Sequence, residues 1–344
     1  MKRSIIPFLA GLLIVCAQPP VNAQDAKEKE QREKQETKDR EREEKNEQKN
    51  REREARNEER NKEREARERQ KYAERYPEQF KEHLTKEYTI QNAAGGTLAI
   101  YNLDGFIKVE GYSGNKVVLE IDKVIAAKDK ETLEQGKKEV KLGFEQIGDS
   151  VVAYMQYPWE TRPHDWREDR DFWGERRRIE YNCTLEYTVK VPAGMSLRLG
   201  TVNNGDIDVK NVGGKLNVSN VNGGISIANA KGTTRAHTIN GDLTVSYASN
   251  PPEASSYYTL NGKLTAIFQP NLSADLQFKS MNGGFYTDFE NTQTLAPTVT
   301  KNLETRGSGT TYRLNKDTQL RIGQGGKQFK FETLNGNIYI KKQS

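Results

Sequence analysis

Residues 204–212, 213–221, 222–230, 231–239 and 240–248 read NGDIDVKNV, GGKLNVSNV, NGGISIANA, KGTTRAHTI and NGDLTVSYA, and these nine-residue units decide the fold. They share the form x-G-x-U-x-U-x-x-U, in which U is mostly apolar. Apolar residues at alternate positions are typical of a half-buried strand. Glycine at the second position suits a corner that needs a positive φ. One strand and one corner per unit predict a mainly β fold and, within it, a β-solenoid.

The dipeptide Asn-Gly marks a larger repeat. It begins at residues 204, 222, 240, 261, 282 and 335, so the first three copies are eighteen residues apart and the next two intervals are twenty-one. Asn-Gly between strands is also the strongest short-range signal for a hairpin. Separate hairpins, however, have no reason to keep a fixed nine-residue phase, which favours a solenoid or a closely related repeat sheet. We expect the last copy, around Leu334–Ile338, to cap or pair with the end of the stack.

The β-repeat domain is expected to span residues 83–344, with an N-terminal β part at 88–195 and the Asn-Gly repeats at 196–344. Leu103-Asp104-Gly105-Phe106 looks like a degenerate copy of the repeat, and Asp129 is the expected N-cap of a short helix that ends near Leu142. Strands of the N-terminal part are predicted within residues 88–90, 98–101, 106–109, 117–121, 151–157 and 179–191.

Residues 1–23 have the pattern of a cleavable signal peptide. Lys2 and Arg3 precede an apolar run from Ile5 to Ala17, and Val21-Asn22-Ala23 offers small residues at the cleavage positions. The run is short for a transmembrane helix. Lipidation at Cys16 is the competing interpretation, but Val15 is a large residue where a lipobox needs a small one. The pattern predicts an exported protein, periplasmic or at the cell surface, with no membrane span after cleavage.

Residues 24–82 form a second, highly charged region. Most of it is Glu, Lys, Arg and Gln, and acid-then-base pairs four residues apart recur, such as Glu28–Arg32 and Glu63–Arg67. Such pairs stabilise a helix. A coiled coil would need apolar a and d positions, and the segment offers only a few alanines. We therefore expect a solvated single helix that acts as a stalk, with disorder as the alternative.

The segment at residues 158–174 is the candidate ligand-binding loop. All three tryptophans of the chain lie in it, seven residues apart, beside arginines and a histidine. Trp and Arg are favoured at contact surfaces, so the loop could form an aromatic platform for a glycan or for an envelope or host surface protein. Packing of the tryptophans onto the β-body is the alternative. The candidate ligand-binding residues are Trp159, Arg162, His164, Trp166, Arg167 and Trp173.

From about residue 88 to the end, the chain resembles the bacterial putative-adhesin family of β-strand-repeat domains. The resemblance rests on the lead-in at Tyr187–Gly194, on the repeats at Thr238–Leu243 and Thr333–Ile338, and on the short helix before them. It implies an exported, β-solenoid-like protein with an adhesive or envelope-associated role, and it supplies no catalytic residues. The charged stalk and the tryptophan loop depart from the family's common pattern.

Residue types and charge restrict the function. His83, His164 and His237 have neither ligand nor triad spacing, and no nucleophile elbow or phosphate-binding loop is present, so we expect no enzyme, no metal and no cofactor. A polysaccharide-acting enzyme and a structural or regulatory envelope scaffold remain the alternatives to an adhesin-like binding protein. The formal net charge of +5 includes Lys2 and Arg3, which argues against nucleic acid as a partner. Cys183 is expected to be a buried thiol on a strand, with pairing between chains as the alternative.

Overall fold

The computed structural model describes residues 70–158, 160–162, 179–296, 299–302, 311–314 and 318–343, together with residues 56, 59, 60, 63, 66 and 67. The chain divides into two compact units, Met1–Ala73 and Glu74–Ser344. The described residues between 56 and 75 are helical, while most of the expected stalk and the whole of the expected signal peptide lie outside the described residues. In the part of the chain that is described, no helix is both long and apolar enough to span a bilayer.

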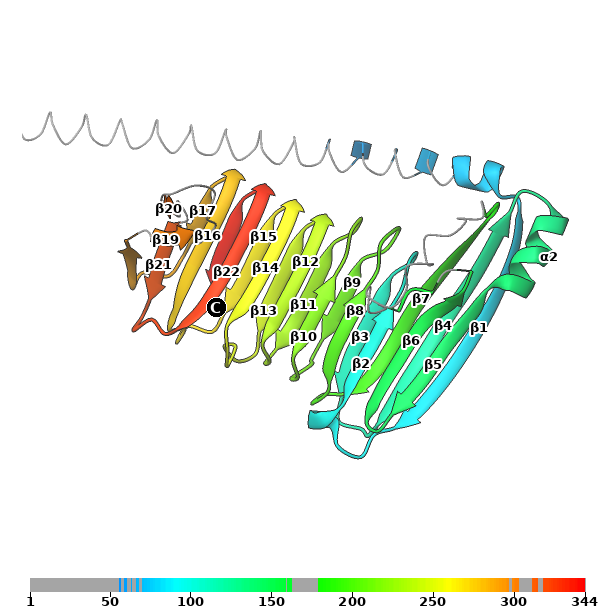
Figure 1. The fold of residues 1–344 in the computed structure, drawn as a ribbon, viewed down its shortest axis with the longest axis horizontal. Helices are drawn as coiled ribbons and strands as arrows, with labels where there is room; N and C mark the ends of the chain where they lie inside the picture. The colour runs from blue at the N-terminus through cyan, green and yellow to red at the C-terminus, as the bar shows by residue number, and fades with distance from the viewer. Residues whose placement is uncertain are drawn as a thin grey trace, which may run out of the picture. The chain divides into compact units, whose positions relative to one another are not determined.

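The second unit is mainly β and is built from two large sheets (Figure 1). A large hydrophobic core lies between them, and a smaller cluster packs where helix α2 meets the first sheet. The first sheet has the order β1 (Glu78–Thr89), β4 (Lys116–Ala127), β7 (Tyr181–Pro192), β3 (Ile107–Tyr112), β9 (Ile207–Lys210), β11 (Ile225–Ala230), β13 (Leu243–Tyr247), β15 (Leu264–Phe268), β23 (Ile338–Lys342) and β17 (Phe285–Thr287).

The second sheet has the order β18 (Thr292–Leu295), β21 (Thr318–Ile322), β16 (Ala274–Asn282), β22 (Lys327–Asn335), β14 (Ser255–Asn261), β12 (Thr234–Asn240), β10 (Leu216–Ser219), β8 (Ser196–Gly200), β2 (Thr97–Tyr101), β6 (Ser150–Tyr157) and β5 (Lys141–Ile147). A separate hairpin joins β19 (Val299–Asn302) and β20 (Thr311–Leu314). A short 3₁₀ turn, η1 (Ala93–Gly95), precedes β2.

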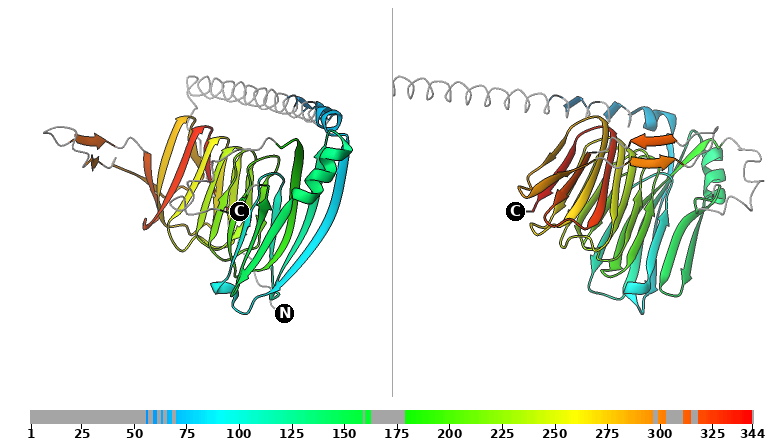
Figure 2. Two further views of the ribbon diagram at one scale, coloured as in Figure 1. Left: turned by 45° about the vertical axis from the view of Figure 1, so that its right-hand side comes forward. Right: turned by 60° about the vertical axis from the view of Figure 1, so that its left-hand side comes forward.

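Successive strands of the repeat alternate between the two sheets. From β8 to β15, each strand lies in the opposite sheet from the one before it. Each strand from β8 to β13 pairs in parallel with the strand two places further along. Each nine-residue unit therefore supplies one strand, as the phase predicted. The register places Ile225 between Ile207 and Leu243, so that equivalent apolar residues stack in the core. Figure 2 shows the strands of both sheets side by side along the stack.

A ladder of asparagines explains why Asn recurs at the corner. The side-chain amide of each donates to the side-chain oxygen of the neighbour, over 2.7–3.0 Å. The ladder uses Asn203, not Asn204, in the first copy, because Asn204 has a positive φ and its amide instead donates to the Asp104 carboxylate. In spatial order the ladder runs Asn203, Asn222, Asn240, Asn261, Asn335 and Asn282.

The glycine and the hydroxyl residue of the motif have a shared structural role. Thr238 and Thr259 point inward, and their hydroxyls donate to the carbonyl oxygens of Gly223 and Gly241 over 2.7 and 2.8 Å. The expectation that the corner glycines need a positive φ is wrong, because none of those following the ladder asparagines has one. Glycine is required there since the turns approach so closely that a Cβ at Gly241 would lie 2.2 Å from the Gly223 carbonyl oxygen.

The final Asn-Gly copy is inserted within the stack. Strand β22 pairs in parallel with both β14 and β16, and β23 pairs with both β15 and β17. The expectation of a terminal cap is therefore wrong. Strands β22 and β23 form the layer of the stack between the copies at Asn261 and Asn282. At this end of the stack, the edge strands of the two sheets are the short strands β17 and β18. Short edge strands limit edge-to-edge pairing.

The N-terminal part extends the same two sheets. Asp104 bridges to Asn203 in parallel and Ile107 pairs with Ile207, which confirms the degenerate copy of the repeat. The predicted helix is α2 (Lys130–Glu139), and the Asp129 carboxylate accepts from the Thr132 amide, 2.8 Å away. β1 begins at Glu78, ahead of the expected boundary at residue 83, because its charged residues alternate with partly buried ones along an edge strand.

Candidate functional site

The tryptophan-containing segment connects β6 in the second sheet to β7 in the first. β6 pairs with β2 and β7 pairs with β3, and β2 and β3 are joined by the degenerate repeat copy. Of the predicted ligand-binding residues, Trp159, His164, Trp166, Arg167 and Trp173 lie outside the described residues. Arg162 alone can be placed, so the aromatic platform stays a prediction.

Arg162 anchors the beginning of this segment to the second sheet. Its guanidinium lies 2.8 Å from a carboxylate oxygen of Glu145 and 2.8 Å from one of Glu160, and its Cζ is 4.6 Å from the centre of the Tyr154 ring. The neighbouring Thr161 hydroxyl donates to the Tyr101 carbonyl over 2.6 Å. Two carboxylates already compensate the charge of Arg162, so its guanidinium has a structural role at the start of the segment.

A cavity of about 240 Å³ lies at the same corner, between the two described ends of the segment. Pro158 and Ile179 line it together with Asp104, Tyr181 and Cys183. Burial raises the pKa of the Asp104 carboxyl, although the hydrogen bond from Asn204 acts in the opposite direction. Burial also raises the pKa of the Cys183 thiol to about 12. Burial at this cavity therefore shifts the pKa of both groups upward, toward their neutral forms.

The raised pKa of Cys183 predicts an unreactive thiol. At pH 8 a thiol with a pKa of about 12 is ionised in about one molecule in ten thousand, and the thiolate is the nucleophile. In a Cys16→Ser variant, where Cys183 is the single thiol, we expect alkylation by iodoacetamide to be about 1,000-fold slower in the folded than in the urea-unfolded chain. Cys183 lies on strand β7 as expected, but it is partly buried, not fully buried. Equal rates in the two states, or dimers linked through Cys183, would contradict a protonated, shielded thiol.

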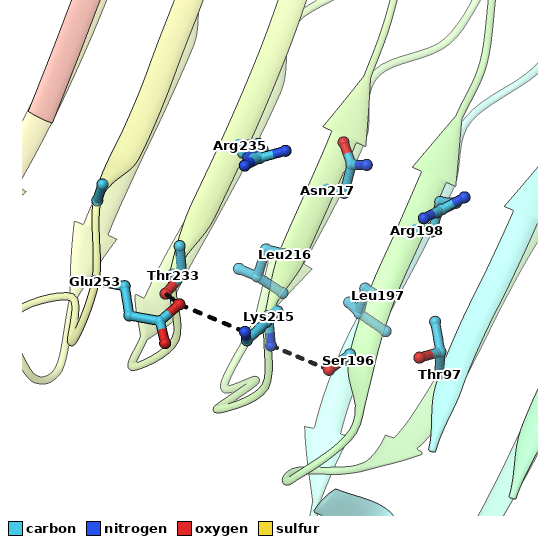
Figure 3. Close-up of a pocket in the computed structure, with 11 residues that line it drawn as sticks. Thr97, Ser196, Leu197, Arg198, Lys215, Leu216, Asn217, Thr233, Arg235 and Glu253 are labelled. Carbon is cyan, nitrogen blue, oxygen red and sulfur yellow. Dashed lines mark hydrogen bonds and ion pairs between the residues drawn. The ribbon is translucent and has the colours of Figure 1, made fainter. Parts of the chain in front are cut away.

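A shallow groove of about 500 Å³ runs over the outer face of the second sheet, across β2, β8, β10, β12 and β14 (Figure 3). Leu197 and Leu216 form part of its floor, and Thr97, Ser196 and Thr233 line the end where the strands begin. Because adjacent side chains of a strand point to opposite faces, the outward residues of neighbouring strands form straight rows across the sheet.

Two arginines and an asparagine form the central row of the groove. Asn217 on β10 is in register with Arg198 on β8 and with Arg235 on β12, and Figure 3 shows the three side chains abreast. All three are exposed, and among the described residues neither guanidinium has an ion pair or a hydrogen bond. Lys215 and Glu253, 3.4 Å apart at the groove's end, pair with each other. The groove therefore carries two uncompensated positive charges.

The chemistry of this groove is that of anion binding. Arginine presents a planar set of donors that fits carboxylates and phosphates, and Asn217 adds an amide between the two cations. No group of three or more potential metal ligands occurs among the described residues. Sequence reasoning missed these residues, although Asn217 and Arg235 each occupy the outward fifth position of a nine-residue unit that forms a strand of the second sheet.

No protein-family profile matches the chain, and a search of curated proteins returns no match. Among solved structures, it is similar to a "putative cell adhesion protein" from Clostridium sporogenes, at 10% identity and a TM-score of 0.41, covering 77% of this chain and 100% of that one. A "putative adhesin" from Bacteroides fragilis has 9% identity, a TM-score of 0.27 and coverage of 76% and 97%. A "putative lipid binding protein" from Parabacteroides distasonis has 9% identity, a TM-score of 0.23 and the same coverage. The functional argument therefore rests on this chain's own groove.

Proposed function

We propose that the chain is an exported, non-enzymatic, adhesin-like binding protein of the cell envelope. In this proposal the alternating two-sheet coil is a β-solenoid, residues 24–77 are a charged stalk that holds it away from its attachment point, and the outer face of the second sheet binds an anionic ligand. The observation that carries the proposal is the exposed pair Arg198 and Arg235, whose charges no described acidic group compensates.

The pair predicts a loss of anion binding on neutralisation. Replacing Arg198 and Arg235 together by glutamine should weaken retention of the full chain on immobilised heparin about tenfold or more, because hydrogen bonds to charged groups contribute about 1.5–3 kcal/mol each. Binding to neutral dextran should be absent for all forms. Surface plasmon resonance at two salt concentrations measures both expectations.

Lys210→Gln/Lys341→Gln is the matched control. Both lysines are exposed on the first sheet, so the control removes the same net charge from the opposite face. It should retain binding within about twofold, since screened charges on a distant face contribute little. A comparable loss in the control would show that net charge alone attracts the anion, and full binding by the double arginine variant would show that the pair is not the binding site. Either result would leave the scaffold role as the better account.

The tryptophan segment is the second candidate surface. Trp159, Trp166 and Trp173 are proposed as an aromatic platform because large apolar residues are seldom collected in a solvated connection. Replacing all three by alanine in the folded chain separates the two surfaces. Loss of binding to glycans or envelope fractions in this variant, with heparin retention intact, would establish the platform, and unchanged binding to both would remove it.

A further inference from the structure

The row through Arg198 and Arg235 continues beyond the groove. Register places Ser256 on β14 beside Arg235, then Lys330 on β22, then Gln277 on β16. Lys330 is exposed and, like the two arginines, has no ion pair or hydrogen bond among the described residues. Cations therefore stand on β8, β12 and β22, and neutral hydrogen-bonding residues stand on the strands between them, β10 and β14.

The inserted C-terminal turn completes this alternation. Lys330 belongs to β22, which enters the sheet between β14 and β16 although its sequence follows both. Neighbouring strands are about 4.8 Å apart, so successive cations of the row stand about 9.6 Å apart and the row spans about 19 Å. At its other end the row continues through Ala99 on β2 and Val152 on β6 to Glu145 on β5. The Glu145 carboxylate is already paired with Arg162.

The acidic residues near the row are already paired with other cations. Glu332 on β22 contacts Lys279, Asp275 on β16 lies 2.7 Å from the Arg321 guanidinium, and Glu253 lies 3.4 Å from Lys215. Their negative charge is therefore compensated locally. The three cations of the row are left to attract an anion from outside the chain, and complementary charge is what gives such a surface its specificity.

We propose that this row binds an extended acidic polysaccharide that lies across the strands and carries one carboxylate or sulfate on alternate sugars. The inference rests on the proposed anion-binding function of the same face and specifies its ligand. The distance between successive cations is comparable to the length of a disaccharide in an extended chain. Asn217 and Ser256, between the cations, match the hydroxyl and amide groups of the uncharged sugars.

A nucleic acid fits the row less well. Each strand of duplex DNA carries a charge about every 3.4 Å of the helix axis, which is far denser than one cation on every second strand of the sheet. Two residues further along the same strands, His237 and Tyr258 form an edge-to-face pair with ring centres 4.6 Å apart. Because they pack on each other, neither ring is free to serve as one of a series of base-stacking platforms.

The test measures the affinity of the full chain for hyaluronan oligosaccharides by isothermal titration calorimetry. Hyaluronan carries one carboxylate per disaccharide. Affinity should rise at least tenfold from the disaccharide to the hexasaccharide, which can reach all three cations, and then level off. Three single variants should each weaken hexasaccharide binding about threefold to tenfold: Arg198→Gln, Arg235→Gln and Lys330→Gln. By analogy with polyanion binding, each should also reduce the slope of log affinity against log salt concentration by about one. Lys341→Gln is the matched control and should change binding less than twofold.

The outcomes separate this inference from the function on which it rests. If neither heparin nor hyaluronan binds, both are overturned. If the disaccharide binds as tightly as the hexasaccharide, or if Lys330→Gln has no effect, the anion-binding function stands and the extended polysaccharide is overturned. Tighter binding of single-stranded DNA than of the hexasaccharide at equal salt would also overturn the polysaccharide and favour a nucleic acid.

Discussion

Replacing Gly241 by alanine should destabilise the folded chain by about 3 kcal/mol, because the added methyl group has no room. Its Cβ would lie 2.2 Å from the carbonyl oxygen, and 2.5 Å from the carbonyl carbon, of Gly223 in the adjacent turn. Backbone atoms on both sides are held by the parallel ladders, so neither turn can move away without breaking hydrogen bonds. Urea unfolding followed by circular dichroism measures the change.

Gly194→Ala is the matched control for the stacked glycines. Gly194 lies in a connection between strands, and an added Cβ would approach no atom closer than 3.6 Å. Its φ is not in the left-handed region, so alanine should be neutral or should stabilise by up to about 1 kcal/mol through the unfolded state. Equal stabilities for Gly241→Ala and Gly194→Ala would contradict the close stacking of successive turns.

Phe331→Ala should cost about 3–5 kcal/mol, because it empties a fully buried aromatic position. Phe331 lies on the inserted strand β22, and its ring stacks on Tyr257 at 4.8 Å and on Phe278 at 5.4 Å between ring centres. It therefore connects the turns on both sides of the C-terminal insertion. Differential scanning calorimetry of the variant should show a transition at clearly lower temperature.

Phe285→Ala provides the comparison within the same aromatic cluster. Phe285 is half-buried on the edge strand β17 and stacks on Phe278 at 4.0 Å between ring centres. Its loss should cost about 1–2 kcal/mol, since less apolar surface is uncovered. If Phe331→Ala were no more damaging than Phe285→Ala, the C-terminal strands would be peripheral to the stack and not an internal turn of it.

The repeat could be predicted from sequence because its signals are local. Alternating apolar residues, the nine-residue phase and the Asp129 cap each depend on residues close in the chain, and the strands at Ile207, Ile225 and Leu243 follow from them. The insertion of β22 could not be predicted in this way. Its position depends on long-range pairing, and the motif around Asn335 is equally compatible with the end of the stack and with its interior.

The binding surface was harder to predict for a different reason. Arg198, Asn217 and Arg235 are outward residues on strands that become neighbours only in the folded sheet, and each alone looks like an ordinary solvated residue of a β-strand. The tryptophans stand out in the sequence because of their residue type. The arginine row is recognisable only from the pairing register of the strands. A prediction that compared fifth positions of alternate units would have found Asn217 and Arg235 but neither Arg198, which precedes the first unit, nor Lys330.

The most direct test of the binding account is a crystal structure of the chain with bound hyaluronan hexasaccharide. The account predicts sugar density across β8, β10 and β12, with carboxylates within hydrogen-bond distance of the Arg198 and Arg235 guanidinium groups. The ligand should continue toward Lys330. Density confined to another surface, such as the corner cavity beside Cys183, or an empty second-sheet face at saturating ligand, would contradict it.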